Sequence, residues 1–175
     1  MGAFPDPSEF AFVPALEAAF EAILAELRAL TDGDFAESPD SLTSVADGYD
    51  ERGWQSFALF GDEAESEEHR ARCPATARAC AAVPGLVNAS FSLFRPGTHL
   101  HPHRGERAGV LRCHLALVVP KGDVAIRAGG ETRSWEPGRC LILDDTFEHE
   151  AWNHAASDRV VLIVSFERAP VGASR

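Results

Sequence analysis

The sequence predicts a mainly β protein with a double-sheet jelly-roll architecture and helices on its N-terminal side. Between residues 87 and 167, short apolar or alternating segments follow one another with Gly- and Pro-containing turns between them. Antiparallel strands joined by short turns form sandwiches and barrels, whereas a parallel sheet needs a helix between successive strands. The clearest alternation starts at Leu111, where every second residue is apolar, while Arg112 and His114 occupy positions between them. One face of this strand is therefore predicted to be buried, and the other to line a cavity.

Residues 1–53 are predicted to form an arm, a helix and a loop. Pro14 suits the first turn of a helix, and after it apolar residues recur at spacings of three and four up to Leu30. This period places them on one face, which is expected to pack on the sheet without taking part in chemistry. A Thr-Asp-Gly sequence ends the helix, and the residues up to 53 are rich in Asp, Ser, Gly and Pro, as loops are.

The jelly-roll core is predicted over residues 54–168, so that the chain of 175 residues forms a single domain, 1–175. Its first strand, 54–60, is followed by a strongly charged segment, 61–72, which is interpreted as a solvated surface loop. A short Ala-rich helix is expected over 74–83 and ends at a Pro-Gly pair. The remaining strands are predicted at 87–95, 110–120, 123–128, 131–135, 139–145, 148–153 and 159–167.

Composition argues against nucleic-acid and membrane partners and favours a cytoplasmic location. The formal net charge of −11 argues against non-specific nucleic-acid binding, which needs a basic surface. No apolar run approaches the length of a membrane span and no signal peptide is visible, so no membrane partner is expected. The four cysteines form no CxxC pair, and two of them lie in strand-like segments, where a free thiol packs as a small hydrophobe. Reduced thiols favour a cytoplasmic location.

Two histidines at strand ends indicate a candidate metal site. His103 sits in a Pro-His-x-Gly turn before one apolar strand, and His149 follows another. Imidazole suits iron, zinc or copper, although a single histidine in such a place is more often a packed or surface residue. The usual non-haem iron site adds a carboxylate, commonly two residues after the first histidine, and that position is Gly105. The third ligand is therefore either a remote group such as Glu106 or a water.

Two arginines predict an anion-binding site beside the histidines. Arg159 begins an apolar strand, where a buried guanidinium is costly unless it has an anionic partner. A guanidinium holds a carboxylate through two parallel hydrogen bonds, and Arg112 shares a strand face with His114. With the two histidines, these residues fit a dicarboxylate such as 2-oxoglutarate next to iron. The alternative is that both arginines form structural ion pairs with the acidic residues of segment 144–148.

The sequence around these residues resembles the aspartyl/asparaginyl β-hydroxylase family. The matching strings are FSLFRPGTHLHPHRG, LRCHLALVVP, TRSWEPGRCLILDDTFEHEAWN and RVVLIV, which cover roughly half of the chain. A further match extends back through Trp54-Gln55-Ser56-Phe57 and Cys73-Pro74-x-Thr76. The PGTHxxPHxG and DDxFEHExW strings carry the most specific part of the resemblance.

The resemblance implies a double-stranded β-helix, a cupin-like jelly roll, that forms a single catalytic domain using Fe(II), O2 and 2-oxoglutarate. It implies that His103 and His149 are the iron ligands and that water takes the place of the usual carboxylate, which leaves Glu106 a minor candidate. Arg112, which faces the cavity, joins the two histidines as a catalytic residue that contacts the substrate carboxylate. The positions that match the family's 2-oxoglutarate-binding residues are Ser92, Arg112, His114, Arg159 and Trp54.

The implied reaction is hydroxylation of the β-carbon of an aspartyl or asparaginyl substrate, with release of succinate and CO2. His101 stands where animal members have Trp, and Val110 stands where they have a basic residue. These departures favour a free amino acid, a small peptide or a carrier-tethered residue as the substrate. The alternatives are an oxygenase of the same family acting on a different amino acid or a lipid acyl chain, and a non-catalytic jelly-roll binding module. The oligomeric state is left open.

Overall fold

The protein, a computed structural model in which residues 2–38, 49–62, 64–105 and 107–168 are described, consists mainly of β-strands. The strands are β1 (Ala36–Glu37), β2 (Trp54–Phe60), β3 (Leu86–Phe94), β4 (Val110–Val118), β5 (Val124–Ala128), β6 (Glu131–Arg133), β7 (Cys140–Leu143), β8 (His149–Asn153) and β9 (Arg159–Glu167). The helices are α1 (Val13–Ala18), α2 (Phe20–Arg28), α3 (Ser66–Arg72) and α4 (Pro74–Ala81), with the short 3-10 segments η1 (Pro7–Glu9) and η2 (Asp32–Asp34). None of the described helices has the length and apolar character needed to cross a membrane.

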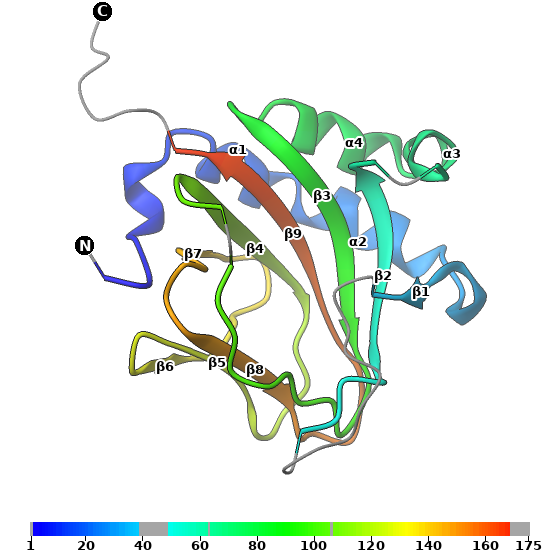
Figure 1. The fold of residues 1–175 in the computed structure, drawn as a ribbon. Coiled ribbons are helices and arrows are strands. Elements are labelled where there is room, and N and C mark those ends of the chain that lie inside the picture. Colours follow the sequence, from blue (N-terminus) through cyan, green and yellow to red (C-terminus); the bar gives the residue numbers. More distant parts are fainter. Residues whose placement is uncertain (1, 39–48, 63, 106, 169–175) are drawn as a thin grey trace, which may run out of the picture.

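The strands form two sheets that face each other, and the helices cover the outer side of the larger sheet (Figure 1). The larger sheet has six strands in the order β1-β2-β3-β9-β4-β7, and the smaller has three in the order β6-β5-β8. Neighbouring strands pair antiparallel in both sheets. The predicted jelly-roll fold with flanking N-terminal helices is therefore confirmed.

The larger sheet has a hydrophobic core on each of its faces. One core packs the sheet against the helices and contains Leu111 and Leu115 of β4 together with Ile23 of α2. The other lies between the two sheets and contains Val161 of β9. Each fully buried large apolar side chain contributes about 1.5–3 kcal/mol relative to an exposed one. The alternation of β4 was predicted correctly, because Arg112 and its even-numbered neighbours face the space between the sheets.

The predicted N-terminal helix is built as two consecutive segments, α1 and α2. Ala19 joins them with a ψ of −2°, and its N–H lies 3.2 Å from the carbonyls of both Ala15 and Leu16. Such shared i−3 and i−4 contacts tighten a helical turn locally. The expected apolar face survives the interruption, because Leu16, Ile23 and Leu27 are all buried in the same core.

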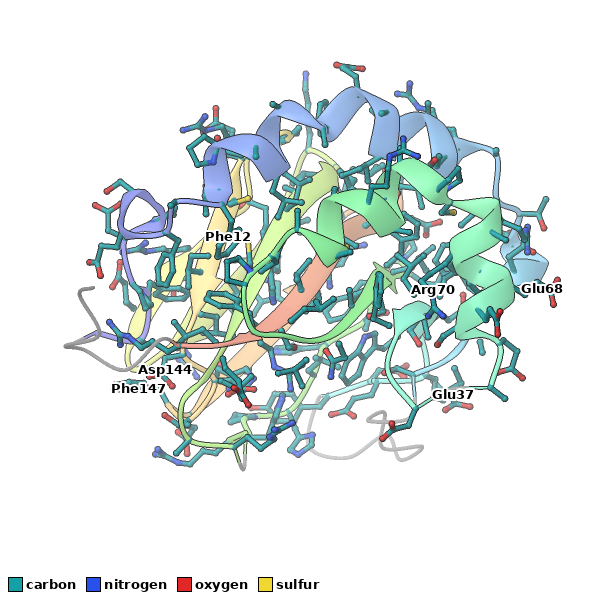
Figure 2. The ribbon with its side chains drawn as sticks, turned by 90° about the horizontal axis from the view of Figure 1, so that it is seen from above. Phe12, Glu37, Glu68, Arg70, Asp144 and Phe147 are labelled. Carbon is teal, nitrogen blue, oxygen red and sulfur yellow. The ribbon has the colours of Figure 1, made fainter. Side chains whose placement is uncertain are left out.

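The charged segment 61–72 was wrongly expected to be a loop, because it contains α3. Two side chains of α3 bind the backbone of β2: His69 Nδ1 lies 2.7 Å from the Ala58 carbonyl, and Arg70 donates to the Leu59 carbonyl at 2.8 Å. The His69 ring also stacks on Phe57 with 3.8 Å between centroids. Figure 2 shows Arg70 on the side of α3 that faces β2. Contacts with a strand therefore stabilise this helix, and local charge density does not reveal them.

The N-terminus of α4 is capped by a carboxylate from α2. Glu26 accepts hydrogen bonds from the backbone N–H groups of Ala75 and Thr76, at 2.7 and 2.8 Å, and from the Thr76 hydroxyl at 2.6 Å. We expect Glu26→Ala to lower the free energy of unfolding by about 1–2 kcal/mol, because it removes a helix cap. Urea denaturation measures this loss. Glu21→Ala, at an exposed position of the same helix, is the control, and an equal loss there would contradict the capping role.

Candidate active site

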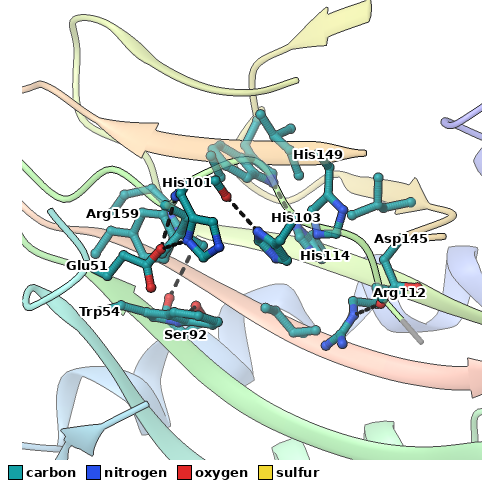
Figure 3. A pocket seen from close by; sticks show the side chains of 18 of the residues that line it. Glu51, Trp54, Ser92, His101, His103, Arg112, His114, Asp145, His149 and Arg159 are labelled. Atoms are coloured by element: carbon teal, nitrogen blue, oxygen red, sulfur yellow. Dashed lines mark hydrogen bonds and ion pairs between the residues drawn. The ribbon is translucent and has the colours of Figure 1, made fainter. Parts of the chain in front are cut away.

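A pocket between the two sheets is lined by all the proposed site residues that the structure describes (Figure 3). Its volume is about 430 Å³. The predicted residues that line it are Trp54, Ser92, His103, Arg112, His114, His149 and Arg159. They lie on β2, β3, β4, β8 and β9 and on the segment before β4. Sheet pairing thus brings together side chains as far apart in the sequence as Trp54 and Arg159.

His103 and His149 face each other across a local β-bridge. Their backbones exchange two hydrogen bonds of 2.9 Å, and their ring centroids are 4.2 Å apart. In each ring Nδ1 contacts a backbone carbonyl, that of His101 at 2.7 Å and that of Phe147 at 3.0 Å. A ring bound in this way carries its proton on Nδ1 and presents Nε2 to a metal. The two imidazoles therefore have the chemistry that a metal ion needs.

The protonation state of His149 also suits metal binding. Burial, followed by the neighbouring His103, lowers the pKa of His149 to about 4, which keeps the ring in the neutral form that ligates. No group of three or more His, Cys, Asp or Glu side chains suited to a metal ion occurs among the described residues. Glu106, the remote candidate for a third ligand, lies outside them. The described part of the site thus offers two imidazoles as ligands for a metal ion.

The carboxylate of Asp145 occupies the space beside Gly105, where a side chain would otherwise lie. A Cβ atom at Gly105 would stand 2.5 Å from both carboxylate oxygens of Asp145, and the Gly105 N–H donates to the Asp145 carbonyl at 2.7 Å. Asp145, which is 4% exposed, binds Arg112 Nε at 2.5 Å. The absence of a side chain at Gly105 therefore makes room for the ion pair that orients Arg112.

Gly105→Ala is expected to displace Asp145 and, with it, Arg112. Overpacking of this kind typically costs about 1–3 kcal/mol of unfolding free energy, and we expect turnover to fall as well, because Arg112 loses its orientation. Thermal unfolding and an activity assay on the same preparation measure both effects. Gly33→Ala is the control, because the nearest atom to a Cβ there is 3.9 Å away. Normal stability and turnover of Gly105→Ala would show that the close contact is easily relieved.

Arg159 lies deep in the pocket as a buried cation. Its side chain is 1% exposed, and its guanidinium lies over the rings of Phe94 and Trp135, at 3.6 and 4.7 Å from their centroids. Its Nε has no hydrogen-bond partner in the described part of the chain, and its contact with the Ser92 carbonyl is long, at 3.5 Å. Burial lowers the pKa of Arg159 to about 9. A buried cation of this kind calls for an anionic ligand.

The alternative interpretation of the two arginines, as structural ion pairs, holds for Arg112 and not for Arg159. Arg112 pairs with Asp145 of the acidic segment 144–148. Among the described residues, Arg159 has no carboxylate within ion-pair distance. The two arginines therefore have different roles: Arg112 is partly exposed and paired with Asp145, whereas Arg159 is buried with no carboxylate partner among the described residues.

Polar groups that can donate hydrogen bonds to a carboxylate lie near Arg159. The Trp135 indole donates to His114 Nδ1 at 3.3 Å, so the His114 proton belongs on Nε2, which has no partner among the described residues. Burial, followed by Arg159, holds the pKa of His114 well below its usual range, so the ring stays neutral. The Trp54 indole donates to the Ser92 hydroxyl at 3.1 Å. The pocket therefore offers several donors around one guanidinium.

The structure adds pocket residues that sequence reasoning did not place in the site. Glu51, only 2% exposed, accepts a hydrogen bond from the His101 backbone at 3.0 Å and contacts the His101 ring. It fell in a predicted loop, and no sequence signal linked it to a histidine fifty residues later. The other lining residues not predicted for the site are Phe94, Leu100, His101, Arg104, Gly105, Ile126, Trp135, Leu143, Asp145, Ala151 and Ile163.

Comparison with known proteins finds a hydroxylase family profile and relatives that are named as hydroxylases. The family profile described as Aspartyl/Asparaginyl beta-hydroxylase matches residues 17–169. The ornithine lipid ester-linked acyl 2-hydroxylase of Rhizobium tropici is 41% identical over 165 residues, which cover 92% of this chain and 59% of that protein. The aspartyl/asparaginyl beta-hydroxylase of Homo sapiens is 38% identical over 116 residues, which cover 63% of this chain and 15% of that protein. The chain thus spans only part of the length of these relatives.

Among solved structures, the prolyl-4-hydroxylase of Pseudomonas putida shares the fold with a TM-score of 0.52. It is 20% identical, and the match covers 87% of this chain and 88% of that one. At this level of identity the likeness concerns the fold alone. The family profile, in contrast, extends over most of the chain and includes every residue of the pocket. The resemblance seen in the sequence is confirmed, and this chain belongs to the aspartyl/asparaginyl beta-hydroxylase family.

Proposed function

We propose that this protein is a dioxygenase that uses Fe(II), O2 and 2-oxoglutarate to hydroxylate a carbon atom next to a carbonyl group. The observation that carries the proposal is that one pocket contains a pair of imidazoles and a buried guanidinium, which has no anionic partner in the described part of the chain. Iron, when bound, supplies the oxidising chemistry: one oxygen atom of O2 enters the substrate, and 2-oxoglutarate becomes succinate and CO2. Family membership supports a hydroxylase, and the cofactors are part of the proposal.

The residues divide into three roles in this proposal. His103 and His149 hold the iron through Nε2, because both Nδ1 atoms are bound to backbone carbonyls. Arg159, with Ser92 and His114 near it, binds the distal carboxylate of 2-oxoglutarate by charge-assisted hydrogen bonds.

Trp54 orients the Ser92 hydroxyl through its indole N–H. Arg112, 34% exposed in its side chain and held by Asp145, is placed to bind the carbonyl or carboxylate group of the substrate. The apolar walls of the pocket keep water away from the reacting carbon.

The reactions named for the two relatives share one chemical feature, the position of the hydroxylated carbon next to a carbonyl carbon. Carbon 2 of an ester-linked acyl chain is bonded to the ester carbonyl carbon, and the β-carbon of an aspartyl or asparaginyl residue is bonded to the side-chain carbonyl carbon. A guanidinium at the position of Arg112 suits either group, because it donates to carbonyl and carboxylate oxygens. The proposed reaction is therefore defined by the position of the carbonyl and not by the rest of the substrate.

Two substrate classes follow. The acyl chain of a lipid is favoured by the similarity to the R. tropici protein, which spans 92% of this chain, compared with 63% for the human protein. This candidate departs from the expectation of no membrane partner, because an acyl lipid resides in a membrane. An aspartyl or asparaginyl amino acid or short peptide is the second candidate, supported by the family profile.

The test incubates the protein with Fe(II), O2 and 2-oxoglutarate in the presence of either substrate class. Succinate is quantified, and mass spectrometry looks for a product that is one oxygen atom heavier, with fragmentation to locate the hydroxyl. Reactions without 2-oxoglutarate, or with the metal chelated, are the controls. An anaerobic Fe(II) titration accompanies the assay. Failure of 2-oxoglutarate to change the absorption of the iron-loaded protein would favour the non-catalytic binding module.

A further inference from the structure

Two histidines that take no part in the proposed hydroxylase site lie close together outside the pocket. His99, which pairs with Trp152 through an isolated β-bridge, lies beside His154, which follows β8. The two rings are 5.1 Å apart at their centroids, and His99 Nδ1 lies 3.3 Å from His154 Nε2. Neither residue lines the pocket that contains His103 and His149. Their side chains are 19% and 40% exposed, so solvent reaches the cluster.

A carboxylate binds the outer nitrogen of each ring. His99 Nε2 lies 3.0 Å from Glu150, whose other oxygen contacts Arg127. His154 Nδ1 lies 2.8 Å from Asp123, whose other oxygen accepts from the Trp152 indole at 2.7 Å. Because guanidinium and indole groups only donate, both carboxylates are acceptors here. The outer nitrogen of each histidine must therefore be the one that carries the proton.

This assignment leaves two lone pairs facing each other. A neutral imidazole has one donor and one acceptor nitrogen, so His99 Nδ1 and His154 Nε2 are both acceptors. Two acceptors in contact repel unless a cation lies between them.

The distance between the two facing nitrogens fits two ligands of one metal ion. His99 Nδ1 and His154 Nε2 lie 3.3 Å apart. Zinc binds imidazole nitrogen at about 2.0–2.1 Å in tetrahedral geometry, which places two ligand nitrogens about 3.3–3.4 Å apart. A carboxylate behind each ligating histidine is also the usual arrangement in zinc sites, because it fixes the ring orientation and makes the ligand nitrogen more basic.

We propose that His99 and His154 bind a divalent transition-metal ion of the zinc class, with Asp123 and Glu150 orienting the two rings. Water completes the coordination, since the described residues provide no third ligand side chain. The ion would tie the segment that leads to His103 to the end of β8, whose first residue is His149. This site is separate from the pocket and does not depend on the proposed hydroxylase activity.

The experiment uses zinc alone as the probe. A His103→Ala/His149→Ala variant lacks the imidazole pair of the pocket, and isothermal titration calorimetry is expected to show one equivalent of bound Zn²⁺. Adding His154→Asn should abolish this binding. Asp123→Asn should weaken it roughly 10- to 100-fold, because the carboxylate behind a ligating histidine contributes that much to affinity. Asp62→Asn, at an exposed acidic residue elsewhere, is the matched control and should bind as the parent does.

A second measurement covers the case in which the double variant does not fold. The chain with both sites intact is then compared with His154→Asn alone, which changes a partly exposed side chain, and the substitution should remove one equivalent of Zn²⁺. Zinc should also raise the thermal unfolding temperature of the intact protein more than that of His154→Asn, because a ligand of the folded state stabilises it. Unchanged zinc stoichiometry in His154→Asn, or no binding by the folded double variant, would overturn the proposal.

Discussion

Arg159→Met is expected to destroy co-substrate binding while making the ligand-free protein more stable. The Arg159 side chain is buried, and its Nε has no partner in the described part of the chain. Replacing a buried charged group by an apolar side chain of similar size often stabilises a fold by about 1–4 kcal/mol. Removing the cation that pairs with a buried carboxylate typically costs about 2–5 kcal/mol of binding, a loss of roughly 30-fold to several thousand-fold.

The opposite signs of these two effects distinguish a binding role from a structural one. Urea denaturation without ligands measures stability, and titration of the iron-loaded protein with 2-oxoglutarate measures affinity. Arg139→Met is the matched control, because this arginine lies outside the pocket and pairs with Glu17. If Arg159→Met unfolds more easily than the parent and keeps its affinity, Arg159 stabilises the fold through its contacts with Phe94 and Trp135 and does not hold the co-substrate.

The strands and most of the candidate site residues could be predicted from the sequence, because the patterns that mark them lie within short segments. Alternation in β4 places Arg112 and His114 on the face opposite Leu111, and this depends only on the two-residue period of a strand. The turn motif around His103 marks a strand end in the same local way. The structure brings these residues into one pocket, as expected. The family motifs then supplied what local patterns could not, namely the expectation that water replaces the carboxylate missing at Gly105.

Other features depend on contacts that no short segment contains. Asp145 fills the space beside Gly105, forty residues earlier, because the backbone of 105 pairs with that of 145. Glu51 reaches His101 across the pocket, and its backbone neighbour Asp50 pairs with His99. Neither contact has a periodicity or a motif. The sequence showed the missing carboxylate at 105, but only the fold shows which side chain uses the space.

His103→Ala is expected to remove nearly all hydroxylation. A site with three protein ligands can keep some metal after losing one, whereas the described part of this site offers two imidazoles. Loss of one leaves a single protein ligand, and we expect iron affinity and turnover to fall by more than roughly 100-fold, the upper range for changes in the groups that merely support a ligand. Metal analysis after dialysis and succinate formation measure the two quantities separately.

The expected loss of iron affinity and turnover depends on which residues hold the iron. The controls therefore substitute other histidines. His69→Gln changes a histidine on α3 that binds the Ala58 carbonyl and lies outside the pocket, and it should keep both iron and turnover. His149→Ala should match His103→Ala, because the two rings are equivalent in their Nδ1 contacts. Full iron content and turnover in either alanine variant would remove that histidine from the metal site. Retention of iron without turnover would instead mean that the remaining imidazole and other ligands hold the ion in a geometry that cannot react.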